Sequence, residues 1–164
     1  MKNKPSVYIE TSIISYLAAR PSPDLMTAAC QQVTAGWWEG PRRSYNLTTS
    51  ALVVAESREG EPQMAKKRLD LLKGISVLKS TEDAKELARA LIAERALPEK
   101  AQADALHIAI ATVHEMNYLL TWNCRHIDNP ATKPLVRQVC AANGYSCPEI
   151  CTPFEIMGVN NYGK

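Results

Sequence analysis

The sequence has 164 residues, enough to bury one hydrophobic core without a second domain, and we expect residues 1–164 to form a single domain. Its composition, 46% hydrophobic and 22% charged, is typical of a globular protein, and no apolar run approaches the roughly 20 residues of a membrane span, so we expect no membrane contact and a cytoplasmic location. The net charge of +2 excludes a strong long-range field for nucleic acid, so any such binding must be local.

Short apolar runs alternate with segments of helical period along the whole chain. We predict strands over residues 6–10, 45–48, 75–78, 118–121 and 149–151. We predict helices over residues 11–19, 25–39, 50–60, 62–73, 81–95, 98–115 and 133–143, and a turn at TPFEIM, residues 152–157. Strands separated by helices indicate an α/β fold with a mostly parallel sheet covered on both faces.

Two glutamates follow predicted strands. Glu10 ends the first strand, directly before a helix that Thr11 or Ser12 can cap. It is either a charge that the helix dipole favours or a ligand at the strand end. Glu56 is the first charge after the apolar run at residues 51–55. It either marks the point where this helix emerges into solvent or belongs to the same edge of the sheet as Glu10.

Asp104 lies in an apolar helix that is followed closely by a short strand. A helix rises about 1.5 Å per residue and a strand about 3.3 Å, so an antiparallel strand retraces about ten helical residues. This arithmetic predicts that Asp104 lies next to Thr121 and Asn123, with His107 on the same helix face. Alternatively, Asp104 is a solvated charge paired with Lys100. We expect His107 to be a packed core histidine rather than a ligand.

Four polar side chains are thus predicted to meet at one edge of the sheet: Glu10, Glu56, Asp104 and Asn123. In parallel α/β sheets, ligands bind beyond the carboxyl ends of the strands. Three carboxylates without matching cations repel one another, and a hard divalent ion with oxygen ligands, Mg2+ or Mn2+, is the usual remedy. Such a site suits the hydrolysis of phosphodiester bonds.

Four segments resemble the motifs of the PIN domains, metal-dependent ribonucleases that include the VapC-type toxins of bacterial toxin and antitoxin pairs. They are YIETSIISYL at 8–17, SALVVAE at 50–56, ADALHIAIA at 103–111 and LLTWNCRHI at 119–127, so the resemblance covers nearly the whole chain. The resemblance implies a three-layer α/β/α fold with a parallel sheet of four or five strands. It also implies Mg2+ or Mn2+ dependence, cleavage of single-stranded RNA leaving a 5'-phosphate, and often a homodimer neutralised by an antitoxin encoded nearby.

The chain departs from the family pattern at two positions. Glu10 stands where the family usually has Asp, and the extra methylene moves the carboxylate outward without preventing it from binding a metal. Asn123 stands where many members have an acid, so the site loses one negative charge and should bind a cation more weakly. Asp128, in the following loop, could compensate.

We expect Glu10, Glu56 and Asp104 to hold the metal directly or through water. Asn123 and Thr121 are expected to orient the attacking water or a phosphate oxygen. The predicted function is a Mg2+- or Mn2+-dependent endoribonuclease acting on single-stranded RNA, which could be the toxin of a toxin and antitoxin pair. The alternative is a PIN fold with weakened or lost catalysis that serves as an RNA-binding or protein-interaction module.

Contacts with RNA must be supplied locally. Besides Thr121, the candidates are Thr11 and Ser12 at a helix start, whose backbone N–H groups can bind phosphate, and Arg125 and His126 after the fourth strand. Two tryptophans, Trp37 and Trp38, end the helix at 25–39. They are expected in the core or at an interface, with stacking on a nucleobase as the alternative.

Overall fold

Strands and helices alternate through the computed structural model, which describes residues 3–161, with side chains described as far as residue 157. The strands are β1 (Ser6–Ile9), β2 (Asn46–Ser50), β3 (Ser76–Leu78), β4 (Tyr118–Leu120) and β5 (Glu149–Cys151). The helices are α1 (Thr11–Ala18), α2 (Leu25–Glu39), the 3-10 helix η1 (Pro41–Ser44), α3 (Ala51–Ser57), α4 (Pro62–Leu72), α5 (Glu82–Ala93), α6 (Gln102–Val113), α7 (Lys133–Ala142) and α8 (Pro153–Asn161).

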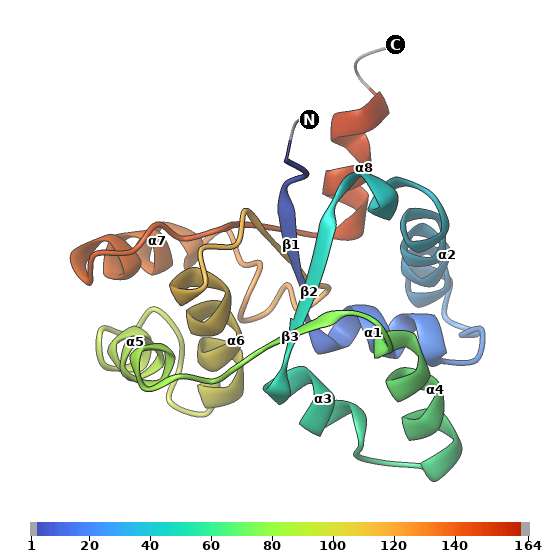
Figure 1. Cartoon of the computed structure of the whole chain (residues 1–164), viewed down its shortest axis with the longest axis horizontal. Helices are drawn as coiled ribbons and strands as arrows, with labels where there is room; N and C mark the ends of the chain where they lie inside the picture. The colour runs from blue at the N-terminus through green and yellow to red at the C-terminus, as the bar shows by residue number, and fades with distance from the viewer. Residues whose placement is uncertain (1–2, 162–164) are drawn as a thin grey trace.

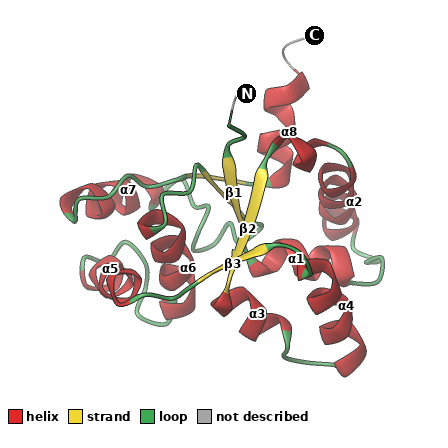
Figure 2. Cartoon of the chain, in the orientation of Figure 1, coloured by secondary structure: helices red, strands yellow, loops and turns green. Residues whose placement is uncertain are grey.

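The strands form one sheet in the order β3-β2-β1-β4-β5, and all four pairings are parallel. The predicted α/β class with a five-stranded parallel sheet is therefore confirmed. Helices α5, α6 and α7 lie on one side of the sheet, and α1, α2 and α4 lie on the other (Figures 1 and 2). The central strand is covered on both faces, since Val7, Tyr8 and Ile9 are all 0% exposed, and this explains why β1 is a continuous apolar run.

The order in which strands are added to the sheet reverses between β1 and β4. From β1 the chain continues to β2 and β3 on one side, whereas β4 and β5 are added on the other side. The ends of β1 and β2 lead into α1 and α3 at the same edge of the molecule (Figure 1). In open parallel sheets, such a switch point between neighbouring strands opens a crevice at the carboxyl edge.

Two predicted elements differ from the structure more than the others do. Helix α6 begins at Gln102 rather than at residue 98, because Pro98 starts a turn that closes with a hydrogen bond from Ala101 N–H to the Pro98 carbonyl. The predicted turn at TPFEIM is the start of α8. Thr152 and Glu155 form a reciprocal capping box there, and a sequence T-x-x-E before apolar residues favours a helix start.

The remaining predicted strands and helices agree with the structure to within three residues at each end. Among the helices of the described chain, none combines the length and hydrophobicity required to cross a bilayer.

Candidate active site

Glu10 leaves the end of β1 and caps α1 with its own side chain. Its Oε2 accepts hydrogen bonds from the backbone N–H of Ser12 at 2.9 Å, from the Ser12 hydroxyl, and from the Thr121 hydroxyl at 3.0 Å. The residue is only 5% exposed. The prediction that Thr11 or Ser12 caps this helix is wrong, because the Glu10 carboxylate reaches back to the free N–H group of the first turn.

Glu56 lies near the end of α3 and faces α1 and α6. Its Oε1 accepts a hydrogen bond from the Thr11 hydroxyl at 2.6 Å and lies 2.7 Å from Nε2 of His107. Burial raises the pKa of Glu56, but the hydrogen bond and charge of His107 and the hydrogen bond from Thr11 outweigh it, and the pKa lies below its usual value. Glu56 is therefore an ionised side chain fixed by two hydrogen-bond partners, and it does not simply mark the point where α3 emerges into solvent.

His107 joins Glu56 to the centre of the sheet. Its Nδ1 lies 2.8 Å from the hydroxyl of Tyr8, which in turn lies 2.8 Å from the hydroxyl of Ser50. Burial raises the pKa of Tyr8 far above its ordinary value, so the phenol keeps its proton. At 1% exposure, His107 is a packed core histidine, as expected, and it is also the partner of a candidate ligand.

The sequence reasoning did not single out Tyr8 or Ser50 for this site. The signal for Tyr8 is a polar hydroxyl in the middle of an otherwise apolar buried strand, since a buried phenol usually needs a hydrogen-bond partner. Ser50 also caps α3, because its hydroxyl accepts a hydrogen bond from the backbone N–H of Val53.

Replacement of His107 by Leu is expected to lower the free energy of unfolding by about 2 kcal/mol, because Tyr8 and Glu56 each lose a hydrogen-bond partner. At this chain length, that loss corresponds to a fall in Tm of about 4–8 °C. Thermal melting measures the change. His114→Leu is the control, since His114 is partly exposed and, among the described residues, its side chain bonds only the Lys79 carbonyl. Unchanged melting of His107→Leu would show that the contacts of His107 do not stabilise the fold.

Asp104 lies in the first turn of α6, and its Oδ1 accepts a hydrogen bond from the side-chain amide of Asn123 at 3.0 Å. The predicted contact of Asp104 with Asn123 is therefore confirmed, whereas the hydroxyl of Thr121, also predicted beside Asp104, bonds Glu10 and the backbone of Asn123. The other end of that amide, Oδ1 of Asn123, accepts the backbone N–H of His126 at 3.0 Å. Within the described chain, Asp104 forms no ion pair with Lys100.

Thr121 connects the two carboxylates that flank the switch point. Its hydroxyl donates to Glu10 and accepts the backbone N–H of Asn123 at 2.9 Å. Glu10 and Asp104 thus belong to one hydrogen-bond network, through Thr121 and Asn123. Thr121 is 0% exposed, so it positions Glu10 from the protein interior. The prediction that Thr121 contacts RNA is therefore wrong, because it does not lie at the surface.

The three carboxylates lack strong neutralising partners. No Lys or Arg of the described chain pairs with Glu10, Glu56 or Asp104, and His107 is the one basic side chain there that does. In each carboxylate, a single oxygen takes every hydrogen bond found among the described residues, and this leaves the second oxygen for a ligand. The carboxyl edge of the sheet is therefore an acidic site in which each carboxylate keeps one oxygen available for a ligand.

Comparison with known proteins gives the fold a name. No protein-family model matches the sequence, and no curated protein matches it. Among solved structures, the chain is similar to VapBC2 from Rickettsia felis bound to a DNA fragment from their promoter, with a TM-score of 0.58 and 13% identity over 90% of this chain and 98% of that chain. The chain has a VapC-type PIN-domain fold.

A second PIN-fold structure supports the same assignment. VapC20 from Mycobacterium tuberculosis, a toxin that cleaves the sarcin-ricin loop, is similar with a TM-score of 0.52 and 18% identity over 69% of this chain and 86% of that chain. Identities this low establish the PIN fold and leave the chemistry of the site to be argued from its residues.

The chemistry of the donors fits Mg2+ or Mn2+, the ions expected from the PIN resemblance. Both are hard cations that take carboxylate oxygens, and Mg2+ commonly keeps several waters in its coordination shell. Among the side chains of residues 3–157, no three Asp, Glu, His or Cys groups lie close enough to hold an ion unaided. An ion here would therefore need water, the Asn123 oxygen or small side-chain movements to complete its shell.

The two departures from the PIN pattern have local physical consequences. At the first position, the Glu10 carboxylate accepts hydrogen bonds from the N–H of Ser12 and the hydroxyl of Thr121. Asn123 donates a hydrogen bond to Asp104, which an ionised acid at that position could not do. The amide thus replaces a repulsion between carboxylates with an attraction.

Of the residues expected to contact RNA, Thr11 and Ser12 take part in hydrogen bonds within the site, whereas Arg125 and His126 remain accessible. The Ser12 backbone N–H already binds Glu10, and the Thr11 hydroxyl binds Glu56, whereas phosphate binding by the Thr11 backbone N–H stays a prediction. Arg125 is exposed and His126 is half-buried, so both can still reach RNA. The catalytic, metal-binding and RNA-binding roles of all these residues stay predictions.

Asp128 is not available to replace the missing acid. It is 7% exposed, and its carboxylate pairs with the ammonium group of Lys133. The Asp128 carboxylate therefore binds the first residue of α7 and does not replace the missing acid at the carboxylate site.

Proposed function

We propose that the protein is a Mg2+- or Mn2+-dependent endoribonuclease that hydrolyses phosphodiester bonds of single-stranded RNA. The observation that carries this proposal is the set of three carboxylates at the switch point, held by neutral donors and one histidine, without a Lys or Arg partner in the described chain. The similar fold of VapC20, a toxin that cleaves the sarcin-ricin loop, supports it.

Glu10, Glu56 and Asp104 would hold the ion, directly or through water. When bound, the ion supplies an activated water and stabilises the charge that grows on the phosphate. Two residues behind these ligands keep them in place: Thr121 holds Glu10, and His107 holds Glu56. Rigid positioning of this kind reduces the reorganisation needed during the reaction.

Asn123 orients Asp104 and is itself fixed by the N–H of His126. The residues after it, Arg125 and His126, provide contacts to the RNA backbone, which position the strand without selecting its sequence. A small net charge and few phosphate contacts predict modest affinity with a weak dependence on salt.

The test is cleavage of a panel of single-stranded RNAs by metal-free, repurified protein, with Mg2+ or Mn2+ added back. Cleavage should appear only with the ion, vanish with EDTA, and be absent in an Asp104→Asn preparation purified in the same way. Cleavage that persists in EDTA, or equally in the Asp104→Asn preparation, would point to a contaminating nuclease.

Binding of the same RNAs without cleavage would favour the second candidate function, a PIN fold that acts as an RNA-binding or protein-interaction module. Two observations favour this alternative: no three acidic, histidine or cysteine side chains of residues 3–157 are close enough to hold an ion, and Asn123 replaces an acid.

We further propose that the protein is a toxin, neutralised by an antitoxin and acting as a homodimer. The similarity to VapBC2, solved on a promoter DNA fragment, supports the pairing with an antitoxin, and the homodimer rests on the PIN resemblance of the sequence. Expression of the protein alone should slow bacterial growth, and co-expression of a small neighbouring gene should restore it. Growth curves measure both effects, with Asp104→Asn as the inactive control. Normal growth despite abundant, cleavage-competent protein would remove the toxin proposal and leave the nuclease proposal intact.

A further inference from the structure

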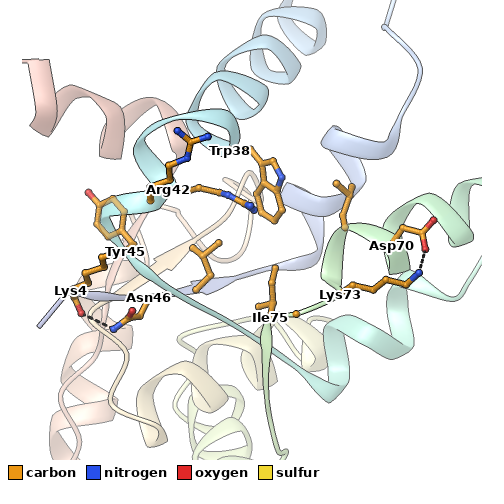
Figure 3. Close-up of a pocket in the computed structure, with 12 residues that line it drawn as sticks. Lys4, Trp38, Arg42, Tyr45, Asn46, Asp70, Lys73 and Ile75 are labelled. Carbon is orange, nitrogen blue, oxygen red and sulfur yellow. Dashed lines mark hydrogen bonds and ion pairs between the residues drawn. The ribbon is translucent and has the colours of Figure 1, made fainter.

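A cavity of about 600 Å³ lies at the edge of the sheet opposite the carboxylates (Figure 3). It is bounded by η1, by the end of α4, and by the residues at the starts of β1, β2 and β3. Its charged lining residues are Lys4, Arg42, Arg43, Lys73 and Asp70, and we call it the basic pocket.

The basic pocket concentrates positive charge. It holds four of the 19 Lys and Arg residues and one of the 17 Asp and Glu residues, which gives it a net +3 in a chain whose total is +2. Lys73 pairs with Asp70 at 2.9 Å, whereas Lys4, Arg42 and Arg43 form no ion pair within the described chain. Cations gathered around one cavity repel one another, and an anion bound between them would relieve this repulsion.

A flat cationic surface forms one side of the basic pocket. The Arg42 guanidinium lies over the Trp38 ring, 4.3 Å from its centroid, and both residues line the cavity (Figure 3). Guanidinium planes and indole rings both stack on nucleobases, and Arg also forms paired hydrogen bonds with phosphate oxygens. The floor is apolar, with Leu47, Leu71 and Ile75.

Charge, flat surface and size together define the ligand. The volume falls within the range of about 300–1,000 Å³ typical of small-molecule sites. A phosphate alone would leave the Trp38 and Arg42 surface unused, and a purely apolar ligand would leave three cations without counterions. We propose that the basic pocket binds a nucleoside phosphate, either as a free nucleotide or as one unit of an RNA strand. This inference is independent of the proposed nuclease, since the pocket shares no residue with the carboxylate site.

The test is calorimetric titration of the whole protein in EDTA, so that no metal-dependent cleavage interferes and failure of the nuclease proposal does not affect the result. The ligands are the four ribonucleoside 5'-monophosphates, the matching nucleosides, inorganic phosphate and a short single-stranded RNA. At least one monophosphate should bind about tenfold more tightly than its nucleoside or phosphate alone, a difference of about 1.4 kcal/mol. RNA binding that is stronger again by such a factor would assign an RNA strand as the source, and equal affinity would assign the free nucleotide.

Matched variants connect the binding to the basic pocket. Arg43→Ala combined with Lys73→Ala should weaken nucleotide binding about tenfold or more. Lys79→Ala combined with Arg137→Ala removes the same charge from exposed positions outside the cavity and should leave binding unchanged. Trp38→Leu should remove most of the advantage of the nucleotide over inorganic phosphate.

Two results would overturn the inference. One is the absence of saturable binding by every nucleotide and by the RNA. The other is an equal loss of binding in the pocket double variant and the control double variant, which would mean general attraction by surface charge. Both double variants change only exposed side chains, so both should fold, and thermal melting checks this. The comparison between them therefore stands even if Trp38→Leu does not fold.

Discussion

Asp104→Asn and Glu56→Gln are each expected to reduce RNA cleavage at least about a hundredfold, which corresponds to about 3 kcal/mol of lost transition-state stabilisation. Each change removes one of the charges that would bind the cation. The fold should survive, because the remaining amide oxygen can still accept the hydrogen bonds now made by Asn123 or by Thr11 and His107. Initial cleavage rates and thermal melting measure the two effects separately.

The two variants should differ in stability. Glu56→Gln is expected to lower the Tm more, because the lowered pKa of Glu56 means that the fold stabilises its charged form. Glu59→Gln and Asp83→Asn are controls with the same loss of charge at exposed positions, and both should cleave RNA normally. A variant that melted much lower while keeping full activity would identify its carboxylate as structural and the metal site as misplaced.

The positions of the site residues along the fold could be predicted from the sequence. Glu10 and Asn123 follow strands that turn out to be paired neighbours, β1 and β4, so both lie at the switch point. Asp104 could be placed because α6 and β4 are consecutive and joined by a short turn. The lengths of these two elements then fix which residues lie opposite one another.

The partners of the carboxylates could not be predicted in the same way. The contact between Tyr8 and His107 spans 99 positions of the chain, and that between Thr11 and Glu56 spans 45. Such contacts depend on how helices pack over the sheet, which hydrophobic periodicity does not specify. The basic pocket has the same origin, because its four cations come from three separate stretches of chain, whose charges look like ordinary solvated residues in the sequence.

Helix α8 and the cap of α1 show that local signals were also missed. The sequence T-x-x-E at residues 152–155 predicts a capping box, and Pro153 suits the first helical position, yet the short apolar stretch favoured a turn. At α1, polar Thr11 and Ser12 are common caps, but Glu10 precedes them and its longer side chain takes the N–H of Ser12.

The change Asn123→Asp should lower the stability of the metal-free protein and raise its affinity for the metal. Without metal, it removes the hydrogen bond that Asn123 donates at 3.0 Å and places two carboxylates side by side, so the variant should be less stable by about 1.5–3 kcal/mol. With Mg2+ or Mn2+, the added charge should tighten binding. A divalent ion and one charge about 4 Å apart attract by several kcal/mol at the dielectric of a protein surface, before desolvation and carboxylate repulsion are subtracted.

A net gain of about 1.4 kcal/mol would already raise the metal affinity tenfold. The measurements are melting curves with and without Mg2+, a calorimetric Mn2+ titration, and cleavage followed at each metal concentration. Gln138→Glu, at an exposed position within α7, adds the same charge away from the site and should change none of them. Tighter binding with retained cleavage would support a cation at Glu10, Glu56 and Asp104. Negligible binding in both the original protein and the Asn123→Asp variant would mean that the carboxylates hold no metal, and that the RNA-binding or protein-interaction module is the better account of this PIN fold.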